Sequence, residues 1–70
     1  MPKLHSSKQI FKVLLRKGFV YISQKGSHAK FKKFGATTLV VIVPAAKKEI
    51  PFGTFRSILR QSQLNEEDFK

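Results

Sequence analysis

The first third of the chain has the apolar spacing of one helix. Ser6 and Ser7 come just before it, where a hydroxyl group can accept a hydrogen bond from a free backbone N–H group. Gly18 follows it and is typical of a helix end. The pattern predicts an α-helix over about residues 7–17. Its apolar face carries Ile10, Val13 and Leu14.

The next segment is rich in β-forming residues and is divided by two glycine turns. It predicts strands over residues 19–24, 27–34 and 37–43, with turns at Lys25-Gly26 and Gly35-Ala36. Three strands so close together form an antiparallel meander. The third strand is apolar on both faces, which predicts a central or helix-backed position, and Pro44 ends it.

A second helical pattern occupies about residues 54–62, and its stripe of Phe55, Ile58 and Leu59 is expected to be buried. A further short helix begins after Asn65, a predicted cap, with acidic residues in its first turn. The sequence therefore predicts one α+β domain over residues 1–70, in the order α-β-β-β-α. We expect a three-stranded antiparallel sheet with both helices on one face and the other face partly open.

Charge narrows the choice of partners. The 70 residues include 14 Lys and Arg against 4 Asp and Glu, which gives a formal net charge of +10. Such an excess draws polyanions, of which nucleic acid is the commonest. The basic residues are spread over strands and loops and not along one amphipathic helix, so we expect no membrane partner.

Composition also bears on metals and on location. The chain has no cysteine, two histidines far apart in sequence and few carboxylates, so we expect neither a metal nor a cofactor. The longest apolar run, residues 39–43, is too short to cross a membrane. Residues 1–6 lack the apolar centre of a secretory signal. We expect a soluble, cytoplasmic protein.

His28 is the residue best placed for chemistry. Strand alternation puts Ala29 and Phe31 on the core side and His28, Lys30 and Lys32 together on the opposite face. Histidine can take or give a proton near neutral pH, and lysines can hold a phosphate and offset the charge on its oxygens. This combination suits RNA cleavage by transesterification, although a lone histidine on a strand is more often an ordinary surface residue.

The turn before His28 adds further groups. Gly26 would let backbone N–H groups approach a phosphate, and Ser27 could donate a hydroxyl hydrogen bond. The second proton carrier is left open: a lysine, Tyr21 or water, or His28 in both steps. We predict His28 as the catalytic residue. The predicted RNA-binding residues are Lys25, Gly26, Ser27, Lys30 and Lys32.

Four blocks of sequence resemble the HicA toxins of bacterial HicAB toxin–antitoxin modules. They are Lys17-Gly18-Phe19, Gly26-Ser27-His28-Ala29-Lys30-Phe31, Val41-Ile42-Val43-Pro44, and the segment 49–61 with its Gly53-Thr54 pair. The resemblance implies a fold like the double-stranded-RNA-binding domain and an mRNA-cleaving ribonuclease that halts translation. It also implies His28 as the catalytic histidine and a cognate HicB antitoxin that covers the site.

The chain departs from the family pattern at two positions. Relatives often carry a histidine where this chain has Ala46, and many have a glycine where it has Gln63. Because Ala46 replaces that second histidine, any catalytic mechanism in this chain would have to use one histidine. Similar folds merely bind RNA. The alternative function is therefore a non-catalytic RNA-binding module that uses the same basic sheet face.

Overall fold

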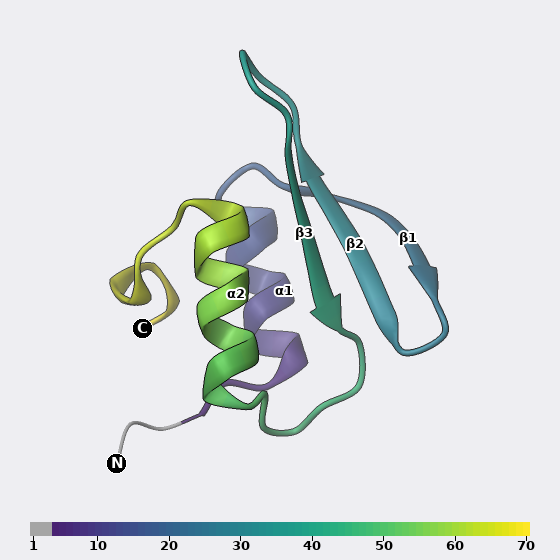
Figure 1. Ribbon diagram of the computed structural model, residues 1–70, viewed down its shortest axis with the longest axis vertical. Helices are drawn as coiled ribbons and strands as arrows, with labels where there is room; N and C mark the ends of the chain where they lie inside the picture. The colour runs from purple at the N-terminus through teal and green to yellow at the C-terminus, as the bar shows by residue number, and fades with distance from the viewer. Residues whose placement is uncertain (1–3) are drawn as a thin grey trace.

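The computed structural model describes residues 4–70 and has the predicted α-β-β-β-α order (Figure 1). The expectation about a secretory signal rests partly on residues 1–3, which lie outside the described residues. In the described part of the chain, no helix is long and apolar enough to cross a membrane. The elements are α1 (Ser7–Arg16), β1 (Val20–Lys25), β2 (His28–Lys33), β3 (Leu39–Pro44), α2 (Phe52–Ser62) and a short 3-10 helix, η1 (Glu66–Phe69).

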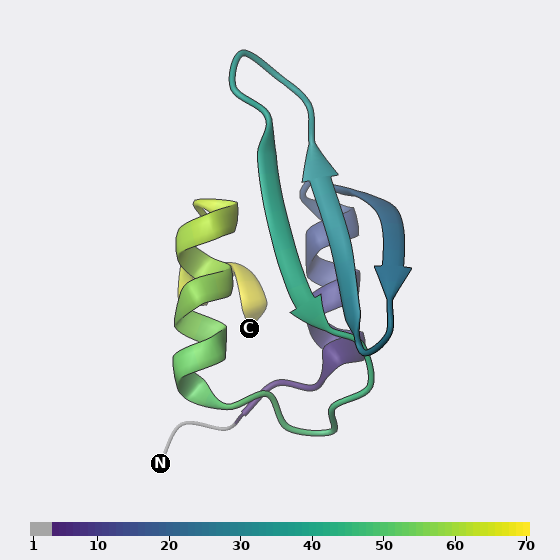
Figure 2. The ribbon, with the colours of Figure 1, turned by 45° about the vertical axis from the view of Figure 1, so that its right-hand side comes forward.

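The three strands form an antiparallel sheet in the order β1-β2-β3, and both helices pack against one of its faces (Figures 1 and 2). Strand alternation assigns the faces of β2 as predicted: Ala29 and Phe31 are buried, whereas His28 and Lys30 are exposed. The face away from the helices is therefore open and carries His28, Lys30 and Lys32, whereas Lys33 lies over the Phe19 ring on the helix side.

β3 is an edge strand and not a central one. Its inward residues Val41 and Val43 are fully buried, but Val40 and Ile42 on the open face are 41% and 37% exposed. Helix α2 runs beside the outer edge of β3, where Gln61 Oε1 accepts a hydrogen bond from the Ile42 N–H at 3.0 Å. The Gln61 side chain thus satisfies the Ile42 N–H group, which at a free sheet edge could pair with another strand.

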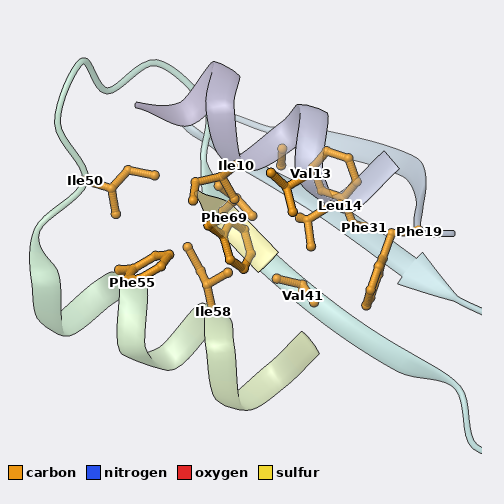
Figure 3. Packing of buried hydrophobic residues seen from close by; sticks show 12 residues of the cluster. Ile10, Val13, Leu14, Phe19, Phe31, Val41, Ile50, Phe55, Ile58 and Phe69 are labelled. Atoms are coloured by element: carbon orange, nitrogen blue, oxygen red, sulfur yellow. The ribbon is translucent and has the colours of Figure 1, made fainter. Parts of the chain in front are cut away.

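The core lies between the sheet and the two helices (Figure 3). It gathers the apolar stripes of both helices, the inward faces of β2 and β3, and Phe69 of η1, as the spacing of apolar residues predicts. Burial of these side chains is the main force that holds so small a chain together. The core residues are Ile10, Val13, Leu14, Phe19, Ala29, Phe31, Val41, Val43, Ile50, Phe55, Ile58 and Phe69.

The ends of α1 follow the predicted chemistry. Ser6, and not Ser7, caps the helix: the Ser6 hydroxyl accepts from the Gln9 N–H at 3.2 Å, and the Ser6 N–H donates to Gln9 Oε1 at 2.9 Å. At the other end Gly18 has φ +95°, a conformation that suits glycine because it has no Cβ. The helix ends at Arg16, one residue earlier than predicted.

Helix α2 begins at Phe52, two residues earlier than predicted. Pro51 at its N-cap has φ −55°, so the fixed proline ring presents a backbone already suited to helix entry. Gln63 after its last turn has φ 60°, the left-handed conformation in which glycine is usual. The residue that departs from the family pattern therefore keeps the backbone geometry of a glycine helix end.

The C-terminal segment folds back onto α1. Asn65 caps η1 as predicted, and the Asn65 N–H donates to the Asp68 carboxylate at 2.9 Å. Lys17 Nζ lies 3.2 Å from the same carboxylate. The backbone hydrogen bond from Asn65 first, and then Lys17, hold the pKa of Asp68 below its ordinary value. Phe69 is buried next to these polar contacts, so η1 belongs to the folded core.

Candidate active site

Four segments from different parts of the fold meet at one end of the molecule, the lower end in Figure 1. They are the first turns of α1 and α2, the turn between β1 and β2, and the loop between β3 and α2. Because a helix carries partial positive charge at its N-terminus, both helices add to the positive field at this end. Neither helix has an acidic residue in its first turn to offset that charge.

His28 is the first residue of β2 and lies at this end of the sheet. It is paired with Lys25 of β1 on one side and with Pro44 of β3 on the other. Gly26, in the turn that precedes it, has φ 60°. Ser27 Oγ lies 3.4 Å from His28 Nδ1, close enough for a weak hydrogen bond that helps to orient the ring. The imidazole is exposed, so a ligand can reach it.

The His28 side chain borders a hollow of about 420 Å³, which we call the His28 hollow. Its walls come from three places: the start of β2, the loop after β3 and the first turn of α2. Besides His28 and Ser27, two further polar side chains line this hollow: Lys47 from the loop and Thr54 from the helix. The residues that line it are Ser27, His28, Pro44, Ala46, Lys47, Pro51 and Thr54.

The start of α2 makes this hollow suitable for an anion. Pro51 at the N-cap supplies no side-chain hydrogen bond to the first turn. The first N–H groups of a helix have no partner within it, and in α2 no cap side chain satisfies them. Such donors beside a lysine and a histidine are the arrangement that binds phosphate groups in many proteins.

A basic stripe continues from the hollow along the open face of β2. Lys30 lies between Ser23 of β1 and Ile42 of β3 in the register of the sheet, and Lys32 follows two residues later. Side chains two residues apart on a strand are separated by about 6.6 Å. That interval is of the same order as the distance between successive phosphates of an extended nucleic-acid strand, so the stripe can follow such a strand.

The structure brings together only part of the predicted site. Ser27 and His28 line the hollow, and Lys25 is the strand partner of His28. Gly26, Lys30 and Lys32 lie outside it, in the turn and along β2.

Tyr21, one of the groups left open as a second proton carrier, does not line the hollow. The register of β1 shifts between Tyr21 and Ser23, and the Tyr21 ring meets buried Phe31 edge-on at 5.5 Å. Its hydroxyl donates to Gln24 Oε1 at 3.1 Å. Tyr21 is 48% exposed and lies on the outer strand beside Phe31, outside the hollow.

Sequence reasoning did not identify Lys47 and Thr54 as site residues. Two signals pointed to them: the lysine pair Lys47-Lys48 three residues after the proline that ends β3, and the Gly53-Thr54 pair at the start of a helix without a capping side chain. Ala46 also lines the hollow, so the position at which relatives often carry a histidine faces the same space as His28.

One acidic residue, Glu49, lies in the loop between β3 and α2, and the other three lie in η1. None of the four carboxylates lines the His28 hollow. Nor do residues 4–70 hold a group of three or more histidine, cysteine, aspartate and glutamate side chains that could bind a metal ion. The candidate chemistry therefore rests on the imidazole, the ammonium groups and the hydroxyls.

Comparison with known proteins gives one family. A family model described as HicA toxin of bacterial toxin-antitoxin matches residues 7–64. These residues run from the start of α1 to two residues beyond the end of α2. No curated protein matches the chain. The matched segment contains every residue that lines the His28 hollow.

Proposed function

The chain belongs to the HicA family of bacterial toxin–antitoxin toxins, and from that premise we propose that it is an endoribonuclease that cleaves mRNA through His28 and so inhibits translation. One observation carries the proposal: His28 borders an open hollow together with Lys47, Ser27 and the uncapped start of α2. That hollow can receive a phosphodiester group beside a residue able to move protons.

The proposed reaction is transesterification within the RNA. The 2′-hydroxyl loses its proton and its oxygen attacks the neighbouring phosphorus. The bond from phosphorus to the 5′-oxygen of the next nucleotide breaks, and that oxygen gains a proton. The products are a 2′,3′-cyclic phosphate and a 5′-hydroxyl end. A positioned histidine contributes roughly 10²–10⁴-fold to the rate of such a proton transfer.

The other groups of the hollow have supporting roles in this proposal. The Lys47 ammonium and the first N–H groups of α2 stabilise the charge that builds on the phosphate oxygens in the transition state. Ser27 orients the His28 ring. Lys25, next to His28 across the β1–β2 pair, and Lys30 and Lys32 along β2 hold the RNA backbone. This scheme needs no metal ion.

Growth of a bacterial host tests the proposal in cells. Expression of the wild-type chain is expected to arrest growth, whereas expression of His28→Ala is not, because the proposed proton carrier is lost. His28 is exposed, so the variant should fold, which circular dichroism of the purified protein checks. Arrest by a folded His28→Ala protein at equal expression would contradict the proposal.

The open sheet face supports a second candidate, a non-catalytic RNA-binding module. The stripe of His28, Lys30 and Lys32 would then hold RNA by its phosphates and its shape alone. This function predicts salt-sensitive binding and no RNA product under any condition. Detection of His28-dependent cleavage products therefore distinguishes the two candidates.

We further propose that a cognate HicB-like antitoxin covers the open sheet face. Beside the lysines of β2, this face exposes Val20, Val40 and Ile42 by 37–44%. Half-exposed aliphatic side chains are not needed to bind phosphates, but together with lysines they suit a protein that presents apolar and acidic side chains.

Co-purification of toxin and antitoxin tests this surface. Ile42→Glu places a negative charge on the proposed interface and is expected to weaken binding at least about tenfold, a loss of about 1.4 kcal/mol. Leu15→Glu is the matched control, because Leu15 is exposed on α1. Equal retention of the antitoxin by both variants would show that it binds elsewhere.

A further inference from the structure

A second hollow lies next to the His28 hollow, between the start of α1 and the loop after β3. Its volume is about 400 Å³, and it shares two lining residues, Ala46 and Lys47, with the His28 hollow. The two spaces are therefore neighbours on either side of one stretch of loop. We call it the lysine hollow. Its lining residues are Ser6, Ser7, Lys8, Ala45, Ala46, Lys47 and Lys48.

Charge identifies the chemistry that this hollow would take. Lys8, Lys47 and Lys48 all line it, and none of the four carboxylates of the chain does. Within residues 4–70 the one ion pair joins Lys17 to Asp68, so these three lysines have no acidic partner there. Three ammonium groups around one concave space attract an anion.

The floor of the lysine hollow is held in place by buried polar contacts. Ser7 is 3% exposed; its hydroxyl donates to the Pro44 carbonyl at 2.6 Å and accepts from the Lys47 N–H at 2.9 Å. The Ser7 N–H donates to the Lys47 carbonyl at 2.9 Å. The backbone that carries Lys47 is thus fixed to the start of α1, which presents Lys8.

We propose that the lysine hollow binds a backbone phosphate of the RNA, on the opposite side of His28 from Lys30 and Lys32. This inference rests on the proposed function, since it extends the path of the same strand. Lysines hold phosphates as point charges, without reading the base sequence. Contacts with the RNA on both sides of the scissile bond would hold that bond against His28. The energy of binding these remote phosphates is then used to position the reacting group.

The test uses a protein in which cleavage is removed, so that binding is measured whether or not the chain is a nuclease. In the His28→Ala background, Lys8→Ala/Lys48→Ala is compared with Lys33→Ala/Lys70→Ala. Lys33 ends β2 at the far end of the strand from residue 28, and Lys70 follows η1. Both double variants lower the net charge of +10 by two. Lys47 is left intact because it borders both hollows.

Binding of a fluorescently labelled single-stranded RNA is measured by anisotropy over a range of salt concentrations. Each phosphate contact on a single strand contributes about 0.7 to the slope of log K against log salt. The proposal places one phosphate in the hollow, so loss of Lys8 and Lys48 is expected to reduce that slope by about 0.7 and to weaken binding about fivefold near 0.1 M salt. The control pair should change affinity less than threefold and leave the slope unaltered.

Several results would overturn the proposal. They are an equal loss of affinity in both double variants, no loss in either, or no RNA binding by the parent protein. If Lys8→Ala/Lys48→Ala unfolds by circular dichroism, Lys8→Gln/Lys48→Gln keeps the chain lengths and repeats the test. In the cleaving protein the same pair is expected to lower kcat as well as raise KM, because the contacts position the scissile bond. Absence of cleavage with retained lysine-dependent binding would reject the nuclease function alone.

Discussion

Ser7 is the residue that connects the first helix to the loop beside the candidate site. A hydroxyl can donate and accept at once, and the Ser7 hydroxyl does both, to Pro44 and from Lys47. A sequence pattern identifies serines near a helix start as caps, but Ser6 fills that role here. Ser7 instead determines where the backbone of Lys47 lies, and Lys47 borders both hollows.

Removal of the Ser7 hydroxyl should therefore destabilise the protein. Ser7→Ala removes both hydrogen bonds, to the Pro44 carbonyl and from the Lys47 N–H, and a typical intramolecular hydrogen bond contributes about 0.5–1.5 kcal/mol. We expect the free energy of unfolding in urea to fall by at least about 1 kcal/mol. Ser23→Ala, at an exposed serine of β1, should change it by less than about 0.5 kcal/mol. Equal, small effects of both substitutions would contradict this role.

The candidate site was predictable only in part, for a reason visible at single residues. His28 stands out in the sequence because the turn, the strand alternation and its lysine neighbours are all local to it. Lys47 and Thr54 reach the hollow only because the loop after β3 and the start of α2 return to the beginning of β2. Local patterns do not specify where such a loop closes.

At the scale of elements, the faces of β2 were the most reliable prediction. Over residues 28–32 its pattern alternates between His or Lys and Ala or Phe, so one register buries the apolar set. β3 gave no such alternation, which predicted a central or a helix-backed position; the structure shows the second, an edge strand covered by α2. Its second apolar face, Val40 and Ile42, is left half-exposed on the open side of the sheet. Apolar residues that the core does not bury are the ones that a partner protein can use.

The C-terminal element gives a pH-dependent prediction. The pKa of Asp68 is lowered from 3.8, so its carboxylate stabilises the folded state above about pH 3.8. That contribution is lost as the pH falls through the lower pKa of the folded protein. Asp68→Asn keeps an oxygen acceptor for the Asn65 N–H but loses the charge. We expect its Tm to lie below that of the wild type at pH 7 and to approach it near pH 3.

Thermal unfolding at several pH values checks this, with Glu66→Gln as a control. Glu66 is in the same 3-10 helix, but Asp68 is the residue whose side chain accepts from Asn65 and pairs with Lys17. A difference in Tm between wild type and Asp68→Asn that stays constant from pH 7 to pH 3 would show that the charge of Asp68 has no part in holding η1.

Acidic residues are gathered mainly in one element of the molecule. Three of the four lie in η1, where Asp68 meets Lys17 just past the C-terminal end of α1, and the fourth, Glu49, lies in the loop after β3. The lysine hollow and the His28 hollow lie at the N-terminal ends of the helices, about 15 Å away along the length of α1. Lys8, Lys47 and Lys48 meet at the end that carries the candidate active site, where they attract a polyanion such as RNA.

The most direct measurement of the central claim is cleavage of a purified mRNA by the wild-type chain and by His28→Ala, with EDTA present and the product ends mapped. We predict cleavage by the wild type that leaves 2′,3′-cyclic phosphate and 5′-hydroxyl ends, and a rate at least about 100-fold lower for a folded His28→Ala protein. Cleavage at an equal rate by both proteins, or RNA binding by the wild type without any product, also in a translating extract, would contradict the account.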